Sequence, residues 1–259
     1  KDMISAARDA LKARQRITYA VPLTVQQATL VQVDGAYSLD VRPPADALPG
    51  RGGLKLALQP KLAEGLPGVR DYFANYPFIC LEQKTSKSIG LRDAKLWQTV
   101  AAQLPTYLDS DGLASYFPPR AGDGNRGSDT LTAYLLAATH EASSIDAAFA
   151  IPDTSRAAME KGLIAFAEGK IQRDFWSPQK DLDMRKIAAI EALSRYGRAN
   201  ARLLGSITIA PNQWPTHTVI DWLNILRRVK EAPKRDERLA EATQILKARL
   251  SYQGTKMVF

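Results

Sequence analysis

Cysteine and histidine are scarce in this sequence. Its 259 residues include one cysteine, Cys80, and two histidines, His140 and His217. A single thiol excludes an intrachain disulfide. It also raises the question of why the thiol is kept, because a lone cysteine serves either packing or reactivity. We expect no metal and no other cofactor.

Long apolar runs are missing as well. No stretch approaches the length that crosses a bilayer, so no transmembrane segment is predicted. Residues 1–16 lack the apolar core and the small-residue cleavage site of a secretory signal. Basic residues are interspersed with acidic ones along the chain. The formal net charge of +8 therefore indicates a solvated surface rather than a nucleic-acid partner.

Residues 20–60 have the pattern of β-strands. The segments 29–33 and 37–41 place apolar residues near period two, and Asp34-Gly35 between them is typical of a tight hairpin turn. Residues 53–59 alternate in the same way and predict a third strand. We therefore expect β-structure in this first part of the chain.

From about residue 66 the apolar residues recur with a helical period. The predicted helices are 67–75, 80–93, 94–108, 129–144, 154–171, 182–196, 199–208, 217–230 and 234–250. Ser128, Asp153, Asp181 and Thr216 stand at the starts of four of them as candidate capping residues. The linkers are short and polar, which is typical of consecutive helix hairpins.

Two segments outside the predicted helices have an extended character. Residues 111–119 are typical of a small hairpin or an extended insert, and residues 251–259 begin another. The sequence stops on Met257-Val258-Phe259 without a helix cap or a polar tail. We interpret this ending as a cut inside a domain that continues in a longer protein.

One segment carries residues suited to covalent chemistry. The sequence YPFICLEQ at residues 76–83 places a thiol, Cys80, three residues before a carboxamide, Gln83, at a predicted helix start. Residues i and i+3 lie on one face of a helix, so the two side chains can meet. The helix N-terminus favours a thiolate and a nearby oxyanion. A thiolate held against a primary amide can expel ammonia and form a thioester.

This segment resembles the thioester signature of bacterial alpha-2-macroglobulins, which are related to the animal alpha-2-macroglobulins and complement thioester proteins. Residues 111–117 and 131–134 are similar to the insert and the following helix of the thioester domain in that family. The resemblance implies a mainly α fold, with an α/α toroid of paired helices over residues 66–259 that is incomplete at the C-terminus. It also implies that residues 1–65 form a β-strand segment of a partial β-sandwich.

A broad-spectrum protease inhibitor is the function that the resemblance implies. In such a trap a protease cuts a bait segment elsewhere in the molecule, and the exposed thioester then acylates a nucleophile on that protease. Cys80 would be the thiol and leaving group, Gln83 would supply the acyl carbon, and Tyr76 and Phe78 would shield the bond from water. Glu82 also matches the motif, and a carboxylate at a helix start needs no further role.

The resemblance also implies the partners and the compartment. The partners are target proteases, which are bound covalently, and other domains of the full-length protein. Proteins of this family are exported to the periplasm. We expect a lipoprotein anchor to the inner membrane in a part of the protein outside this sequence. On this interpretation the chain is not an enzyme and serves in bacterial defence.

The residues alone leave two alternatives. Cys80 could be the nucleophile of a cysteine hydrolase or a transglutaminase-like enzyme, with His140 or His217 as the base, although the local signatures of those families are absent. The helices could instead form a repeat scaffold with a basic surface, but no fixed period supports it. In a thioester domain either histidine could assist acyl transfer to hydroxyls, and a packed or helix-start position is the simpler interpretation for both.

Overall fold

The computed structural model describes residues 12–14, 31–43, 45, 50, 53–54, 56–58, 67–173, 181–208, 210–253 and 256–258. The chain divides into two units, Lys1–Leu58 and Gln59–Phe259. The boundary predicted between residues 65 and 66 lies outside the described residues. Among the described residues, helices occur only in the second unit, where the first of them begins at Pro67.

The first unit does not show the predicted strands. The described residues within 31–43 and 53–58 form no strand, and Thr29 and Leu30 lie outside the description, so the partial β-sandwich is not confirmed. Gly35 has the positive φ of 92° that a hairpin turn requires. Apolar side chains are exposed at alternate positions: Val31, Val33, Tyr37, Leu39, Val41, Leu54, Leu56 and Leu58. A lone pair of strands is only marginally stable in water, because nothing covers its apolar face.

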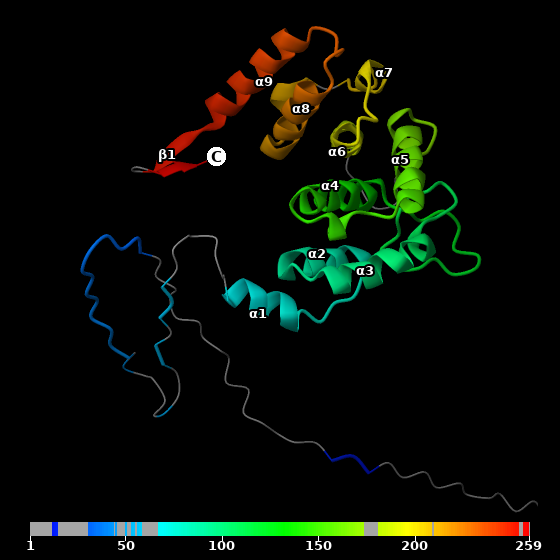
Figure 1. Cartoon of the computed structure of the whole chain (residues 1–259). Helices are drawn as coiled ribbons and strands as arrows, with labels where there is room; N and C mark the ends of the chain where they lie inside the picture. Colours follow the sequence, from blue (N-terminus) through cyan, green and yellow to red (C-terminus); the bar gives the residue numbers. More distant parts are fainter. Residues whose placement is uncertain are drawn as a thin grey trace, which may run out of the picture. The chain divides into compact units, whose positions relative to one another are not determined.

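The second unit is mainly helical (Figure 1). Its described α-helices are α1 (Pro67–Asn75), α2 (Leu81–Leu91), α3 (Ala94–Gln103), α4 (Asp129–Ile145), α5 (Asp153–Ala167), α6 (Leu182–Arg195), α7 (Ala201–Leu204), α8 (Thr216–Arg228) and α9 (Arg235–Arg249). Three short 3-10 turns are η1 (Leu104–Tyr107), η2 (Ala147–Phe149) and η3 (Pro211–Gln213). An antiparallel hairpin of β1 (Ser251–Gln253) and β2 (Lys256–Val258) follows α9 and confirms the hairpin predicted there.

The helices of the second unit pack as successive pairs. Alternate helices contact one another in chain order: α2 with α4, α4 with α6, and α6 with α8. Consecutive helices also pack together in the pairs α2–α3, α4–α5 and α8–α9. Figure 1 shows α2 and α3 lying together with α4 next to them. The fold is thus mainly α, and closure of the described helices into a toroid stays a prediction.

Helix α6 lies at the centre of this packing. Its successive residues Ala189 to Leu193 are all buried, because α4, α5 and α8 pack around it. The apolar side chains of its neighbour α4 follow helical spacing, with Leu131 and Leu135 both buried. Burial of one such side chain contributes about 1.5–3 kcal/mol, so apolar contact is the main force that holds the pairs.

Helices α3, α5 and α7 each end at least four residues earlier than the sequence pattern predicts, and for α5 the cause is local. The pattern extends α5 to residue 171, but Gly169 has a φ of 75°. The N–H groups of Gly169 and Lys170 donate to the carbonyls of Phe166 and Ala165, both at 2.9 Å. This is the Schellman arrangement that terminates a helix, so the left-handed glycine stops α5.

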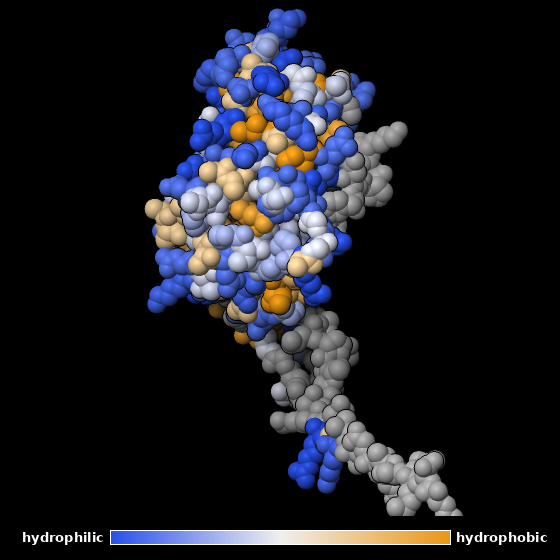
Figure 2. All heavy atoms as spheres, turned by 90° about the vertical axis from the view of Figure 1, so that its right-hand side faces the viewer, coloured by the Kyte–Doolittle hydropathy of each residue, from blue (hydrophilic) through white to orange (hydrophobic). Residues whose placement is uncertain are grey.

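The face of the second unit drawn in Figure 2 is largely hydrophilic. On the face drawn in Figure 2, hydrophobic side chains lie in small groups between hydrophilic ones. Arginines are paired with carboxylates, as in Arg156–Asp153 and Arg198–Glu160. No helix in the described part of the chain is both long enough and apolar enough to cross a bilayer. The interspersed charges fit the solvated surface that the sequence predicts.

A group of ionised side chains lies where α6 packs against α8. Glu191 is 3% exposed and accepts from Arg195 at 2.8 Å and from Arg228 at 2.7 Å. Asp221 of α8 lies beside this group. Burial and the charge of Glu191 raise the pKa of Asp221 to about 6, and the two arginines offset only part of this effect. Asp221 therefore favours its protonated form more in the folded chain than in the unfolded chain.

Stability should therefore depend on pH through Asp221. A folded pKa above the unfolded value stabilises the fold fully below the unfolded pKa, and this contribution is lost as the pH rises through about 6. Asp221→Asn removes the titration. At pH 7 its free energy of unfolding should exceed that of the wild type by about 1–2 kcal/mol after solvent screening, and at roughly pH 4 the difference should vanish.

Urea unfolding at the two pH values measures this difference. Glu237→Gln is the control, because it removes an exposed carboxylate of α9. A gain of the same size in Glu237→Gln, or no gain in Asp221→Asn at pH 7, would contradict the role of Asp221.

Candidate functional site

Cys80 and Gln83, the two residues of the motif, are hydrogen-bonded to each other in the first turn of α2. Cys80 is the N-cap residue, with φ −66° and ψ 162°, and it is 7% exposed. Its backbone N–H donates to Oε1 of Gln83 at 3.3 Å, and its side chain accepts from the backbone N–H of Gln83. The pair forms a reciprocal capping box in which a thiol takes the place that serine or threonine usually holds.

The local sequence explains this geometry. Residues 76–79 have no regular structure, and Pro77 cannot donate a backbone hydrogen bond, so the helix begins only after Cys80. The i, i+3 spacing then places Cys80 and Gln83 on one face. The N–H groups at the helix start carry partial positive charge, which favours a thiolate and a developing oxyanion. The structure thus brings together the two residues that the sequence singles out.

A segment distant in sequence supports the start of α2. The backbone N–H of Leu81 donates to the carbonyl of Tyr116 at 2.8 Å. Tyr116 belongs to the segment 109–127. For its residues 111–119 the sequence predicts a small hairpin or an extended insert, and the structure shows an isolated bridge that joins Ala114 to Leu108 just before the segment. The position of this segment therefore helps to set the position of the Cys80 turn.

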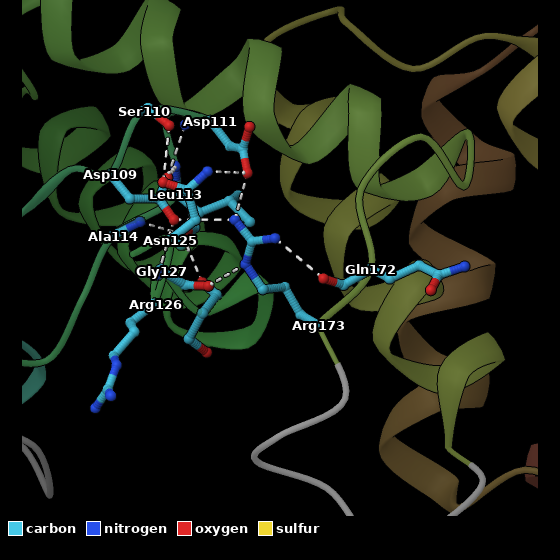
Figure 3. A network of polar contacts seen from close by, with 12 residues as sticks. Asp109, Ser110, Asp111, Leu113, Ala114, Asn125, Arg126, Gly127, Gln172 and Arg173 are labelled. Carbon is cyan, nitrogen blue, oxygen red and sulfur yellow. Dashed lines mark hydrogen bonds and ion pairs between the residues drawn. The ribbon is translucent and has the colours of Figure 1, made fainter. Parts of the chain in front are cut away.

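Arg173 fixes the segment 109–127 through a buried polar network (Figure 3). Its guanidinium donates to Asp109 at 3.0 Å, to Asp111 at 2.6 Å and to the carbonyl of Gly127 at 2.9 Å. Asp109 also accepts backbone N–H groups of the same segment. Burial lowers the pKa of Arg173, but the hydrogen bonds of the two carboxylates outweigh it and raise the pKa overall. The network thus holds the permanently charged guanidinium of Arg173 together with the two carboxylates that balance its charge.

Aromatic side chains lie beside Cys80. Tyr72, Tyr76 and Phe78 make consecutive ring contacts, with centroids 5.2 Å and 5.3 Å apart. Burial raises the pKa of Tyr76, and the charges of Tyr72, Glu82 and Cys80 raise it further. Phe78 is 60% exposed. The structure thus places Phe78 against the Tyr76 ring, and the shielding of a thioester by either residue stays a prediction.

A carboxylate and two hydroxyl groups form a second cluster on α2. Ser86 Oγ donates to Oε1 of Glu82 at 2.9 Å and lies 2.6 Å from the hydroxyl of Tyr134 on α4. Burial raises the pKa of Tyr134, the hydrogen bond with Ser86 lowers it, and the charge of Glu82 raises it. Burial also raises the pKa of Tyr116, and Glu82 and Cys80 add to this shift. Both phenols therefore stay protonated near neutral pH and can donate hydrogen bonds.

The two histidines have other surroundings. His140 of α4 contacts the ring of Tyr196 at a centroid distance of 5.0 Å. His217 is exposed in the first turn of α8, which packs against α6 and α9. The contacts found in the described ranges place neither histidine at Cys80. In the same ranges, no group of three or more His, Cys, Asp or Glu side chains is arranged to hold a metal ion.

The cluster around Glu82 is not evident from the sequence. Tyr116 and Tyr134 lie in segments that carry the family resemblance, but no pattern gives either of them a role. Ser86 stands four residues after Glu82, a spacing that places both on one helix face and could have indicated their hydrogen bond. Tyr134 is 48 positions from Ser86, and no local pattern connects residues so far apart.

Comparison with known proteins gives information on the fold. No protein-family model matches the sequence, and no curated protein matches it. Among solved structures, the chain is similar to native alpha-2-macroglobulin from Escherichia coli, in a crystal structure that spans the residues from domain MG7 to the C-terminus. The identity is 16%, the TM-score is 0.52, and the similarity covers 68% of this chain and 30% of that one. The chain therefore spans less than a third of the solved chain, and a likeness at this identity shows a related fold alone.

Proposed function

We propose that Cys80 and Gln83 form an internal thioester. The observation that carries the proposal is the reciprocal capping box, because it fixes the buried thiol on the backbone of Gln83 and the carboxamide of Gln83 on the backbone of Cys80, within one helical turn. The thiolate of Cys80 adds to the carboxamide carbon, Cδ, of Gln83 and a bond forms between Sγ and Cδ. The C–N bond breaks, and ammonia leaves with the proton that the thiol has lost. One thiol and one carboxamide thus give one thioester and one ammonia.

The thioester would serve the covalent capture of proteases. The motif and the related fold support a capture domain of a broad-spectrum protease inhibitor of the alpha-2-macroglobulin type. After a bait segment elsewhere is cut, a nucleophile on the protease attacks Cδ of residue 83 and Cys80 leaves. The proposed partners are target proteases and other domains of a longer protein. The proposed location is the periplasm, with an inner-membrane anchor outside this sequence. The acyl group is used once, so the chain would not be an enzyme.

Thiol titration and intact mass test the bond in the native protein. Cys80 should be blocked, and the mass should be short by one ammonia. Methylamine should then release the thiol and remain attached to residue 83. Gln83→Glu is the matched control, because it keeps the size of the side chain but has no ammonia to expel. Its Cys80 should titrate from the start, and a freely reactive Cys80 with full mass in the wild type would refute the thioester.

Protease capture has a separate readout. The full-length protein, with the bait segment that lies outside this sequence, should form an adduct with an added protease that survives denaturing electrophoresis, whereas its Gln83→Glu variant should form none. Repeated turnover of a peptide or amide substrate by Cys80 would instead favour a cysteine hydrolase or a transglutaminase-like enzyme. A capture domain would modify one target molecule per chain, whereas an enzyme would make many product molecules per chain.

A further inference from the structure

A small pocket lies among α7, α8, α9 and the chain that joins α7 to α8. Helices α8 and α9 pack together, and η3 contacts α9 (Figure 1). The apolar part of the pocket wall includes Leu204, Ile207 and Pro211. The empty volume is about 380 Å³, which includes space open to solvent, and this size is near the lower limit of small-molecule sites. The pocket shares no lining residue with the capping box at Cys80.

Two tryptophans in the pocket wall have unused hydrogen-bond donors. Trp214 is 3% exposed and Trp222 is 4% exposed, and their ring centroids lie 5.7 Å apart at an interplanar angle of 75°. Both indole N–H groups are buried, and neither finds an acceptor in the part of the chain that the structure describes. A buried indole N–H is normally paired, because an unpaired donor in such a place is costly. The pocket therefore suits a ligand that has acceptor oxygens.

Helix α9 adds two opposite charges to the same pocket. Arg238 lies over the ring of Trp222, with its Cζ atom 5.7 Å from the ring centroid. Glu241 follows three residues later, on the same face of the helix, and also lines the pocket. Across the described ranges, neither side chain forms an ion pair or a hydrogen bond, either with the other or with a third group. The pocket wall thus offers one cation and one anion to a ligand.

The charges at the start of α9 are already paired. Lys234 lies 3.7 Å from Glu237, and Arg235 lies 3.0 Å from Asp236. These four side chains therefore do not compete for a ligand in the pocket. A ligand that matches the pocket wall needs a carboxylate, an ammonium group and an apolar body.

We propose that this pocket binds an α-amino acid with an apolar side chain. The carboxylate pairs with the guanidinium of Arg238, whose N–H groups suit a planar anion, and it supplies the acceptors that the two indole rings lack. The ammonium group pairs with Glu241, and the side chain lies against the apolar wall. The charge of Glu241 disfavours a carboxylic acid that has no ammonium group. This site is distinct from the proposed thioester and does not depend on it.

Saturation-transfer NMR of the full-length protein, with L-leucine as the probe, tests the site. L-Leucine should bind with a dissociation constant on the order of 1 mM, as expected for a ligand of about nine non-hydrogen atoms. Glycine lacks the apolar side chain, leucinamide lacks the carboxylate, and N-acetyl-L-leucine lacks the ammonium group. Each of the three should bind at least about tenfold more weakly. No saturation transfer to L-leucine at about 10 mM, or equal binding of glycine, would overturn the proposal.

Two variants assign the binding to this pocket. Arg238→Gln and Glu241→Gln should each weaken the binding of L-leucine by about tenfold or more, because each removes one charge partner. Arg227→Gln is the matched control, since it removes an exposed arginine of α8 that does not line the pocket, and it should bind like the wild type. Wild-type affinity in either of the two variants, or an equal loss in Arg227→Gln, would contradict the site. If circular dichroism shows that Arg238→Gln does not fold, Glu241→Gln decides, because the exposed side chain of Glu241 is not needed for packing.

Discussion

Replacing Arg173 by alanine should lower the free energy of unfolding of the helical unit by about 3–5 kcal/mol. Arg173 is 6% exposed, and the side chain of its partner Asp109 is 1% exposed. Without the guanidinium, the carboxylates of Asp109 and Asp111 lose their counter-charge, and the carbonyl of Gly127 loses a donor. An unpaired charge in such a site costs far more than an exposed ion pair contributes.

Arg126→Ala is the matched control for this variant. Arg126 lies in the same segment, is exposed, and donates to the backbone carbonyl of Asp123. Figure 3 shows its side chain extending away from the network. Its loss should change the free energy of unfolding by about 0.5 kcal/mol or less. Urea unfolding followed by circular dichroism measures both variants, and equal stabilities would show that the Arg173 network contributes little.

Gly112→Ala should destabilise the helical unit about as much as Arg173→Ala does, because the added methyl group would clash with neighbouring atoms. Gly112 has a φ of 84°, and a Cβ atom there would lie 2.2 Å from the backbone carbonyl oxygen of Ala158 in α5. The contact is with backbone atoms and cannot be relieved by a rotamer change. Strain at a positive φ costs about 1–3 kcal/mol, and overpacking against a rigid helix costs about 1–3 kcal/mol more. We expect a loss of about 3–5 kcal/mol in the free energy of unfolding, measured by urea denaturation.

Gly122→Ala separates the cost of backbone strain from the cost of the steric clash. Gly122 lies in the same segment and has a φ of 90°, but a Cβ atom there would meet nothing within 4 Å. This variant should therefore show only the cost of backbone strain, about 1–3 kcal/mol. If Gly112→Ala and Gly122→Ala lose the same stability, the close approach of the segment to α5 is not what requires a glycine at residue 112.

The helices of the second unit are largely predictable because their causes are local. Apolar residues repeat with the helical period along α4 and α6, and Ser128 caps α4 by accepting from the N–H of Leu131, as its position predicts. The other three predicted caps are wrong in detail, because Asp153, Asp181 and Thr216 make no capping hydrogen bond. The meeting of Cys80 and Gln83 is local in the same sense, since they lie three positions apart in the sequence. Such features depend on residues that are close in sequence, so they can be predicted from the sequence alone.

The supporting parts of the site could not be predicted, because their partners are distant in sequence. Arg173 contacts Asp109 and Asp111, which lie 64 and 62 positions away. Periodicity carries no information about such pairs, and an isolated arginine or aspartate on a polar segment predicts only solvent exposure. The alternating residues of the first unit show the opposite case. Their pattern is typical of strands, yet a strand also needs a partner that covers its apolar face.

Because Gln83 belongs to the capping box at Cys80, the two possible products of the proposed reaction would differ in the stability of the helix start. Capture by an amine would leave an amide at residue 83, whereas water would leave a carboxylate. A carboxylate at the third position of a helix interacts favourably with the N-terminal dipole, by about 0.3–1 kcal/mol, and an amide lacks this charge. The first turn of α2 would therefore be more stable in a chain whose thioester has been hydrolysed by water than in a chain that has captured its target.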